Sequence, residues 1–381
     1  MAQVTLGDVA IESRETYKGD KSGMPIVGLE HLIPEDVVLS LWDRDKENTF
    51  TKMFRKGDML FGRRRAYLKK AAQAPFDGIC SGDITVIRAK EDRLIPELLP
   101  FIIQNDVLFD FAVGKSAGSL SPRVKWENLK NYKFELPPLP EQKKLAEALW
   151  AINDTLQAYQ KLLIETDELV KSQFIEMFGT WQDTKYDVKT LEELCEPIKD
   201  GTHKTPTYTD DKENGFLFLS SKDVTSRYVD WDHPMYIPAD LHDELSKRIS
   251  PKVGDILLAK NGTTGIAAIV DRDVVFDIYV SLALLRFHPG NNIKFMWSAI
   301  NMPETKAQFD GNLKGIGVPN LHLGEIKKTK MVVPPIELQD EFAKFIEQSD
   351  KSKFALQNSI SAARETKRSI IANALGIKGK E

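Results

Sequence analysis

The chain has 381 residues, of which 42% are hydrophobic and 28% charged, and a formal net charge of −4, as is usual for a soluble protein with room for two domains. This charge gives no overall attraction to polyanions, so any nucleic-acid surface must be local. No apolar run reaches the ~18 residues of a membrane span, and the charged start of the chain does not suit a signal peptide. We therefore expect a cytoplasmic protein with no membrane partner, in which Cys80 and Cys195 are buried thiols.

Residues 1–136 are predicted to form a mixed domain of short strands and helices. Strands are expected at residues 26–29, 57–61 and 84–87, and a helix at residues 96–108. The second strand begins at a Gly-Asp turn dipeptide. A glycine-rich loop then precedes the end of the domain.

A long helix is predicted after Pro137-Pro138. The chain has no Gly or Pro from Glu141 to Phe178, and Gly179 ends the run. Apolar side chains recur at intervals of four and three, at Leu145, Leu149, Ile152, Leu156, Tyr159 and Leu163. This spacing is typical of a coiled-coil seam, and at about 1.5 Å per residue the helix would be a rod of roughly 55 Å. A single amphipathic rod of this kind needs a partner helix.

The second half of the chain repeats the first at an offset of 197 residues. Pro334-Pro335 repeats Pro137-Pro138, and a second run without Gly or Pro extends from Leu338 to Leu375. The shifted seam falls on Phe342, Ile346, Leu356, Ile360, Ala363 and Ala374, with Ser349 and Lys353 as weaker positions. The same offset pairs Gly57-Asp58 with Gly254-Asp255, Arg63 with Lys260, Gly114 with Gly311, Gly118 with Gly315 and Pro122 with Pro319. We infer an internal duplication in which each half is a mixed domain followed by a long helix.

The second mixed domain is predicted between the two rods. Strands are expected at residues 216–219, 254–258 and 282–285, and a helix at residues 293–300.

The densest basic cluster lies between Lys52 and Lys70, and Asp58 is the acid that opposes it within the stretch. It contains the triplet Arg63-Arg64-Arg65 followed by Tyr67. Arginines next to an aromatic ring suit phosphate clamping and bidentate contacts to guanine. A solvated strand edge, kept from aggregating by charge, is the alternative. The glycine-rich loops near Gly114 and Gly311 could approach a phosphate, but neither has the complete phosphate-binding GxxxxGK[ST] pattern.

No catalytic motif stands out. Leu136 and Val333 precede the two Pro-Pro pairs, so neither pair forms the loop of an amino-methyltransferase, and no FxGxG cofactor loop occurs. The six histidines show no metal-ligand spacing, and no nucleophile motif is found. We therefore expect no catalytic residue and no metal site.

Several segments resemble the specificity subunits of type I restriction-modification systems. Residues 56–67 and 76–84 are similar to a target recognition domain of this family, and residues 200–206 with 254–262 resemble a second such domain of a different subtype. The segments Leu136-Pro137-Pro138-Leu139-Pro140-Glu141-Gln142 and Val333-Pro334-Pro335-Ile336-Glu337-Leu338-Gln339 resemble the entrances to the family's two spacer helices. The resemblance covers essentially the whole chain. The second entrance has Glu337-Leu338 where the first has Pro140-Glu141, and its seam is more polar.

The resemblance implies an α+β protein with two pseudo-repeated target recognition domains, separated by two long antiparallel helices that form a coiled coil. The expected domains are 1–136 and 179–333, and the expected spacer helices are 137–178 and 334–381. It further implies a non-catalytic subunit that reads a bipartite, asymmetric site on double-stranded DNA. Two modification (methyltransferase) subunits and the restriction (endonuclease and translocase) subunits would be partners, and S-adenosylmethionine, ATP and Mg would bind to them rather than to this chain.

The candidate DNA-binding residues lie in loops of both halves. They are Arg63, Arg64, Arg65, Tyr67, Lys69, Lys70, Lys115, Ser116 and Ser119 in the first half, and Thr202, His203, Lys204, Thr205, Lys260, Asn261, Thr263, Thr264, Asn312 and Lys314 in the second. Two other classes of function stay open. One is a coiled-coil adaptor that binds protein and not DNA; the other is a stand-alone DNA methyltransferase or nuclease.

Overall fold

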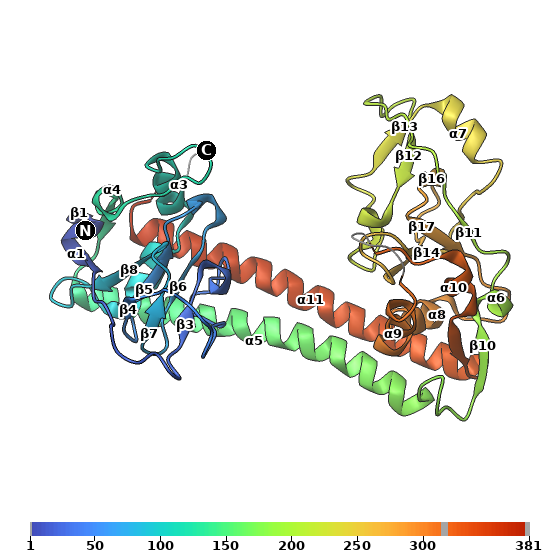
Figure 1. Ribbon diagram of the computed structural model, residues 1–381, viewed down its shortest axis with the longest axis horizontal. Coiled ribbons are helices and arrows are strands. Elements are labelled where there is room, and N and C mark those ends of the chain that lie inside the picture. Colours follow the sequence, from blue (N-terminus) through green and yellow to red (C-terminus); the bar gives the residue numbers. More distant parts are fainter. Residues whose placement is uncertain (1, 314–318, 378–381) are drawn as a thin grey trace. The chain divides into compact units, whose positions relative to one another are not determined.

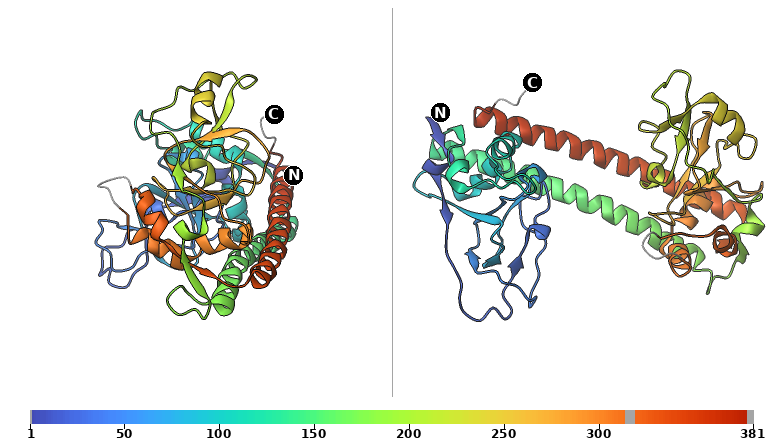
Figure 2. Two further views of the ribbon diagram at one scale, coloured as in Figure 1. Left: turned by 90° about the vertical axis from the view of Figure 1, so that its right-hand side faces the viewer. Right: turned by 45° about the horizontal axis from the view of Figure 1, so that its top comes forward.

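The computed structural model describes residues 2–313 and 319–377 (Figure 1). The chain divides into two units: unit 1 comprises residues 1–162 and 355–381, and unit 2 comprises residues 163–354. Two long helices, α5 (Leu139–Phe178) and α11 (Ile336–Ala374), each begin in one unit and end in the other, and both are unbroken in Figure 2. Each unit has its own hydrophobic core.

Unit 1 consists of short strands and helices that precede α5. Its strands are β1 (Ala2–Thr5), β2 (Ala10–Ser13), β3 (Ile26–Val27), β4 (Lys52–Phe54), β5 (Met59–Gly62), β6 (Ala71–Gln73), β7 (Gly78–Cys80), β8 (Ile84–Ala89) and β9 (Lys133–Leu136). Its short helices are α1 (Leu6–Val9), α2 (Leu99–Ile103), α3 (Asp106–Gly114) and α4 (Trp126–Leu129), with 3-10 turns η1 (Leu29–His31), η2 (Ala66–Leu68) and η3 (Pro96–Leu98).

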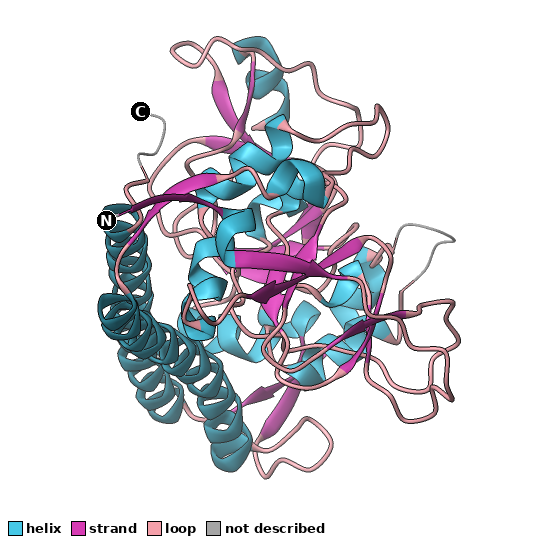
Figure 3. Cartoon of the chain, turned by 90° about the vertical axis from the view of Figure 1, so that its left-hand side faces the viewer, coloured by secondary structure: helices cyan, strands magenta, loops and turns pink. Residues whose placement is uncertain are grey.

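Unit 2 is built from similar pieces. Its strands are β10 (Asp187–Thr190), β11 (Lys199–Asp200), β12 (Phe216–Leu219), β13 (Met235–Ile237), β14 (Ile256–Ala259), β15 (Ala267–Ile269), β16 (Phe276–Ile278), β17 (Leu282–Leu285) and β18 (Lys330–Val333). Its helices are α6 (Leu191–Leu194), α7 (Ala239–Leu245), α8 (Ile293–Ile300), α9 (Pro303–Asp310) and α10 (Leu323–Lys328), with the 3-10 turn η4 (Ser221–Val224). The strands are short and joined by long loops (Figure 3).

The sheet topology confirms the duplication. The four-stranded sheet of unit 1 has the order β2-β8-β5-β6, and that of unit 2 has the matching order β11-β17-β14-β15. A second sheet contains a parallel pair in each case, β3 with β7 and β12 with β16. Its third strand differs, because β4 adds to β7 whereas β13 adds to β12. The central strands β5 and β14 both follow a glycine with positive φ, Gly57 at 91° and Gly254 at 89°, a conformation that glycine adopts without a steric penalty.

One predicted helix is divided. Residues 96–108 were expected to form a single helix. Instead, η3 continues directly into α2, which ends at Ile103, and a separate helix, α3, begins at Asp106. Asn105 lies between them in an extended conformation, and its side chain accepts a hydrogen bond from the Leu108 N–H at 2.8 Å. Asparagine often accepts a hydrogen bond from a free N–H at the start of a helix in this way. Asn105, within a largely apolar run, was therefore the sequence signal that a new helix starts here.

A buried glutamine explains why the segment after each Pro-Pro pair is repeated. Gln142 donates a hydrogen bond to the Pro137 carbonyl at 2.9 Å and accepts one from the Ile95 N–H at 3.0 Å. Gln339 donates to the Pro334 carbonyl at 2.8 Å and accepts from the Asn292 N–H at 2.9 Å. Each glutamine therefore fastens the first turn of a long helix to its globular domain.

The two long helices pack antiparallel within each unit, as expected. In unit 1 the first half of α5 and the last turns of α11 share a core, with Leu149 and Ile371 both buried. In unit 2 the last turns of α5 and the first turns of α11 meet, where the Phe174 and Phe342 rings lie 5.5 Å apart in an edge-on contact. Of the predicted seam positions, Leu145, Leu149, Phe342 and Ile346 contact these cores. Ile371 and Leu375, which α11 contributes to the core of unit 1, were not predicted.

Candidate nucleic-acid interface

A tip of unit 1, at the end of β5, joins three segments that are far apart in the sequence. The Arg63 N–H donates to the Asp83 carbonyl at 3.0 Å. Arg64 pairs with Arg123 in an antiparallel bridge, and Ala117 pairs with the other side of Arg123 through two hydrogen bonds of 3.0 Å. The arginine triplet and the glycine-rich loop, both predicted to bind DNA, are therefore adjacent.

The carboxylate of Asp83 orients two arginines at this tip. Arg123 donates to it from Nε at 2.8 Å and from a terminal nitrogen at 3.3 Å, and a terminal nitrogen of Arg64 lies 3.5 Å away. The hydrogen bonds from Arg123, and then the charges of Arg123 and Arg64, hold the pKa of Asp83 below its ordinary value. The side chains of Arg64 and Arg123 are still 40% and 42% exposed, so each guanidinium offers further donors to a ligand.

The glycine-rich loop beside this tip holds three more candidates. Lys115 and Ser119 are exposed, and the Ser116 hydroxyl donates to the Ala112 carbonyl at 2.9 Å at the end of α3. Next to Ser119, Leu120 is 93% exposed, which is unusual for a large apolar side chain.

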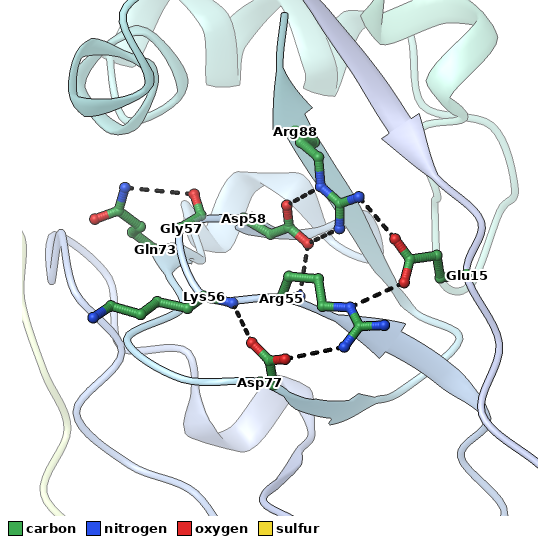
Figure 4. Close-up of polar contacts among 8 residues, drawn as sticks. All are labelled: Glu15, Arg55, Lys56, Gly57, Asp58, Gln73, Asp77 and Arg88. Carbon is green, nitrogen blue, oxygen red and sulfur yellow. Dashed lines mark hydrogen bonds and ion pairs between the residues drawn. The ribbon is translucent and has the colours of Figure 1, made fainter. Parts of the chain in front are cut away.

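The basic stretch from Lys52 to Lys70 does not form one surface, and acids from outside the stretch oppose it in addition to Asp58. Arg55 pairs with Glu15 and Asp77, at 3.1 Å each (Figure 4). These acids come from distant parts of the chain and could not be assigned to the cluster from sequence spacing. Arg55 and Asp58 of the network in Figure 4 directly precede β5, whereas the arginine triplet directly follows it, so the two groups lie at opposite ends of one strand.

Three other candidates lie in the loop between β5 and β6. The amine of Lys69 is 2.5 Å from Asp106 at the start of α3, and the amine of Lys70 donates to the Leu29 carbonyl at 2.7 Å. Tyr67 is exposed. Both lysine amines therefore already contact oxygen atoms of the protein, whereas the tyrosine ring is exposed to solvent and accessible to a ligand.

The tip of unit 2 repeats the backbone pattern at the end of β14. The Lys260 N–H donates to the Ser281 carbonyl at 2.8 Å, as Arg63 does to Asp83 in unit 1. Asn261 pairs with Asn320 in an antiparallel bridge, 197 positions after the corresponding arginine pair. The repeated backbone thus presents different side chains in the two units.

Asp200 joins the Thr202–Thr205 loop to this second tip. Its buried carboxylate lies 3.3 Å from the amine of Lys260, 3.1 Å from Arg248 and 3.3 Å from His203. Lys260 is only 5% exposed, so its amine neutralises the buried Asp200. This ion pair connects the end of β14 to the start of the Thr202–Thr205 loop. His203 and Lys204, by contrast, are exposed.

The remaining candidates of unit 2 are placed as follows. The backbone of Thr202 pairs with Tyr279, Thr205 and Thr263 are exposed, Thr264 is buried, and Asn312 is exposed after α9. Lys314 lies outside the described residues.

Sequence reasoning missed Arg123, Asn320, Arg248 and the acids that position them. A signal was present for two of these, because Arg123 and Asn320 directly follow the matched prolines Pro122 and Pro319. Arg248 carried no such signal, because its counterpart at the fixed offset is Thr51, which does not resemble it.

A family model described as the type I restriction modification DNA specificity domain matches residues 1–166 and 184–363. The chain belongs to this family. In curated proteins, 107 residues are 31% identical to the specificity subunit of the type I restriction enzyme EcoDI from Escherichia coli, and they cover 27% of this chain and 23% of that subunit. The specificity subunit of the type I restriction enzyme MjaVIII from Methanocaldococcus jannaschii is 21% identical over 342 residues, which cover 85% of this chain and 75% of that subunit.

A solved structure shows the same fold. It is described as the structural basis of complex assembly and conformational transition of the type I R-M system; it is 20% identical, covers 98% of this chain and 97% of its own, and has a TM-score of 0.59. The comparisons support a DNA specificity subunit of a type I restriction-modification system, which recognises rather than catalyses, and none favours the adaptor, methyltransferase or nuclease alternatives.

Among residues 2–313 and 319–377, no helix is both long enough and apolar enough to cross a bilayer.

Proposed function

We propose that this type I specificity subunit reads a bipartite DNA site, one half with each unit, through the tips at the ends of β5 and β14. The observation that carries the proposal is the repeated tip itself. In both units, two loops from distant parts of the chain form backbone hydrogen bonds or bridges with the end of the central strand. Polar or cationic side chains cover that end. Loops held by a rigid sheet are where binding residues are commonly placed.

The chemistry of the two tips supports an asymmetric site. In unit 1 the exposed groups are guanidiniums and the Lys115 amine, which suit phosphates and the acceptor atoms of guanine. In unit 2 they are amides, hydroxyls, the exposed His203 and Lys204, and the guanidinium of Arg248. Because the donor and acceptor patterns differ, the two half-sites should differ in sequence.

We further propose that the chain assembles with two modification subunits and with restriction subunits, in the cytoplasm where the DNA lies. Both halves contain a long helix and its Pro-Pro entrance, each held in place by a buried glutamine. A docking surface that occurs twice in one chain can seat two copies of one partner even though the recognition domains differ. S-adenosylmethionine, ATP and Mg would bind to the partners, and this chain would supply sequence recognition and a scaffold.

DNA recognition is tested by replacing Arg63, Arg64 and Arg65 together with Ala. Selection of bound duplexes from a random library, using the full chain co-expressed with its modification subunit, should show relaxed preference in one half-site only, because unit 2 is unchanged. Lys56→Ala, an exposed lysine at the other end of β5, is the matched control and should keep both half-sites. Unchanged site and affinity in the triple variant would show that the arginines are only a solvated edge. A uniform loss of affinity across sequences, with a shallower salt dependence, would instead assign them to phosphate contacts.

The docking proposal is tested separately by charge reversal on α5. Lys143 and Lys144 are exposed on its first turns, so Lys143→Glu with Lys144→Glu should weaken assembly while the isolated chain stays folded. Lys247→Glu, in a loop of unit 2, is the control. Native mass spectrometry should show one chain with two modification subunits. A saturated 1:1 complex would contradict the duplicated docking site.

A further inference from the structure

The two tips place different amino acids on the same repeated backbone bridge. Arg64 pairs with Arg123 in unit 1, and Asn261 pairs with Asn320 in unit 2. The backbone contacts around the bridge also correspond: the Arg65 N–H donates to the Pro122 carbonyl at 2.8 Å, and its counterpart Gly262 donates to the Pro319 carbonyl at 3.1 Å. The chain therefore holds two residues in equivalent positions in each unit and varies only their chemistry.

The arginine pair of unit 1 can only donate hydrogen bonds. Asp83 contacts both guanidiniums, and the Arg64 Nε also donates to the Ser121 hydroxyl at 2.5 Å, so both side chains are oriented before any ligand arrives. Guanine presents two acceptors, N7 and O6, at its major-groove edge, which matches two donors of a guanidinium. Adenine offers one acceptor and one donor there, and its donor would face the guanidinium.

The asparagine pair of unit 2 has an unmet need for donors. Asn261 and Asn320 are both partly exposed, and within residues 2–313 and 319–377 neither Oδ1 atom has a hydrogen-bond partner. Both Oδ1 atoms are shielded from solvent although the side chains are partly exposed, so a base can pair with either oxygen only after the amide group turns outward. A ligand that donates a hydrogen bond to the turned amide would supply the missing partner.

Adenine is the base whose major-groove edge fits that need. Its N6 amino group donates to an amide oxygen while its N7 accepts from the amide NH2, a bidentate match. Guanine offers two acceptors at this edge and leaves the amide oxygen unpaired.

We propose that this bridge is the specificity-determining position of each unit, selecting guanine through Arg64 and Arg123 in one half-site and adenine through Asn261 and Asn320 in the other. The inference rests on the proposed DNA-reading function and adds which base class each unit selects. Arg123 and Asn320 thereby join the recognition residues, and Asp83 is a positioning residue in unit 1.

The test exchanges the two pairs in the full chain, co-expressed with its modification subunit, and selects bound duplexes from a random library. Arg64→Asn with Arg123→Asn should abolish the preference for guanine at one or more positions of a single half-site. Asn261→Arg with Asn320→Arg should abolish an adenine preference in the other half-site only. The preference lost should be about 5- to 150-fold per contact, the range of one good bidentate pair. The milder double Ala variants should relax the same positions, and thermal unfolding of each variant checks that it is folded.

The outcomes separate this inference from the proposed function. If the wild-type complex selects a bipartite site and folded double variants select the same site, the bridge does not read bases and the inference is overturned. It is also overturned if the affected position prefers a base other than guanine for unit 1 or adenine for unit 2. If the wild-type complex selects no sequence at all, the proposed function fails and the inference fails with it.

Discussion

Arg88 donates two hydrogen bonds, of 2.7 and 2.8 Å, to the carboxylate of Asp58, which is 2% exposed. Unit 2 repeats this pair with Arg286 and Asp255, at 2.8 and 2.7 Å. In each unit the pair joins the turn before the central strand to its neighbouring strand, β8 in unit 1 and the end of β17 in unit 2. The Asp58 carboxylate also raises the pKa of Arg88.

Removing the charge of Asp58 should destabilise unit 1 strongly. Asp58→Asn removes the buried partner of Arg88, which keeps only the more exposed Glu15 at 2.7 Å. Breaking such a pair should cost up to about 3 kcal/mol. The matched control is Asp77→Asn in the network of Figure 4, where both Asp77 and its partner Arg55 are exposed. That change should cost less than about 1 kcal/mol. Urea unfolding of the two variants measures the difference, and equal losses would contradict it.

Stability should fall in acid partly because of Asp83. Arg123 lowers the pKa of Asp83 in the folded state below its ordinary value of 3.8, so its contribution is complete above that pH and is lost as the pH falls through the lowered pKa. Asp83→Asn removes the contribution at neutral pH. The difference in unfolding free energy between the wild type and this variant should therefore shrink between pH 6 and pH 3. A difference that grows in acid would mean that the carboxylate is not stabilised by the arginines.

Both cysteines should be unreactive in the folded protein. Cys80 and Cys195 are free and buried, which confirms the expectation from the sequence, and burial raises the pKa of each thiol to about 12. A thiol-reactive dye at pH 8 should label neither residue until denaturant is added, since the thiolate is the reactive form. Cys80→Ser and Cys195→Ser variants identify the source of any signal. Rapid labelling of native protein would show that one of the thiols is accessible.

Gly201 should be essential to the tip of unit 2. A Cβ at this position would lie 1.9 Å from the carbonyl oxygen of Ile278, part of the backbone that pairs with Thr202. Gly201→Ala should therefore separate the Thr202–Thr205 loop from β16, at a cost of about 1–3 kcal/mol typical of overpacking, or more. Gly324→Ala is the control, because its Cβ would meet no atom within 4 Å and the residue lies in α10. Equal stability of the two variants would show that the backbone adjusts freely.

The structure also shows which inferences a linear pattern can support. The two long helices were predictable because the spacing of apolar residues along one segment is enough to indicate a coiled-coil seam. Gly179 indicated where the first helix ends. The repeated Pro-Pro and Gln signature was visible for the same reason, although its bonds to Ile95 and Asn292 were not. The helix at 293–300 was also predicted at its observed bounds.

The composition of each tip depended on tertiary structure, because strand pairing joins residues that no local pattern relates. Asp83 and Arg123 are 40 positions apart and meet only after β5 and β8 have paired. Asp200 likewise receives Lys260 once β11 and β14 flank β17. Periodicity and fixed spacing along the chain were therefore enough to predict the duplication, the long helices and the family. Which charges are neutralised, and which donors and acceptors stay available, could not be predicted, because both depend on contacts between distant segments that form only on folding.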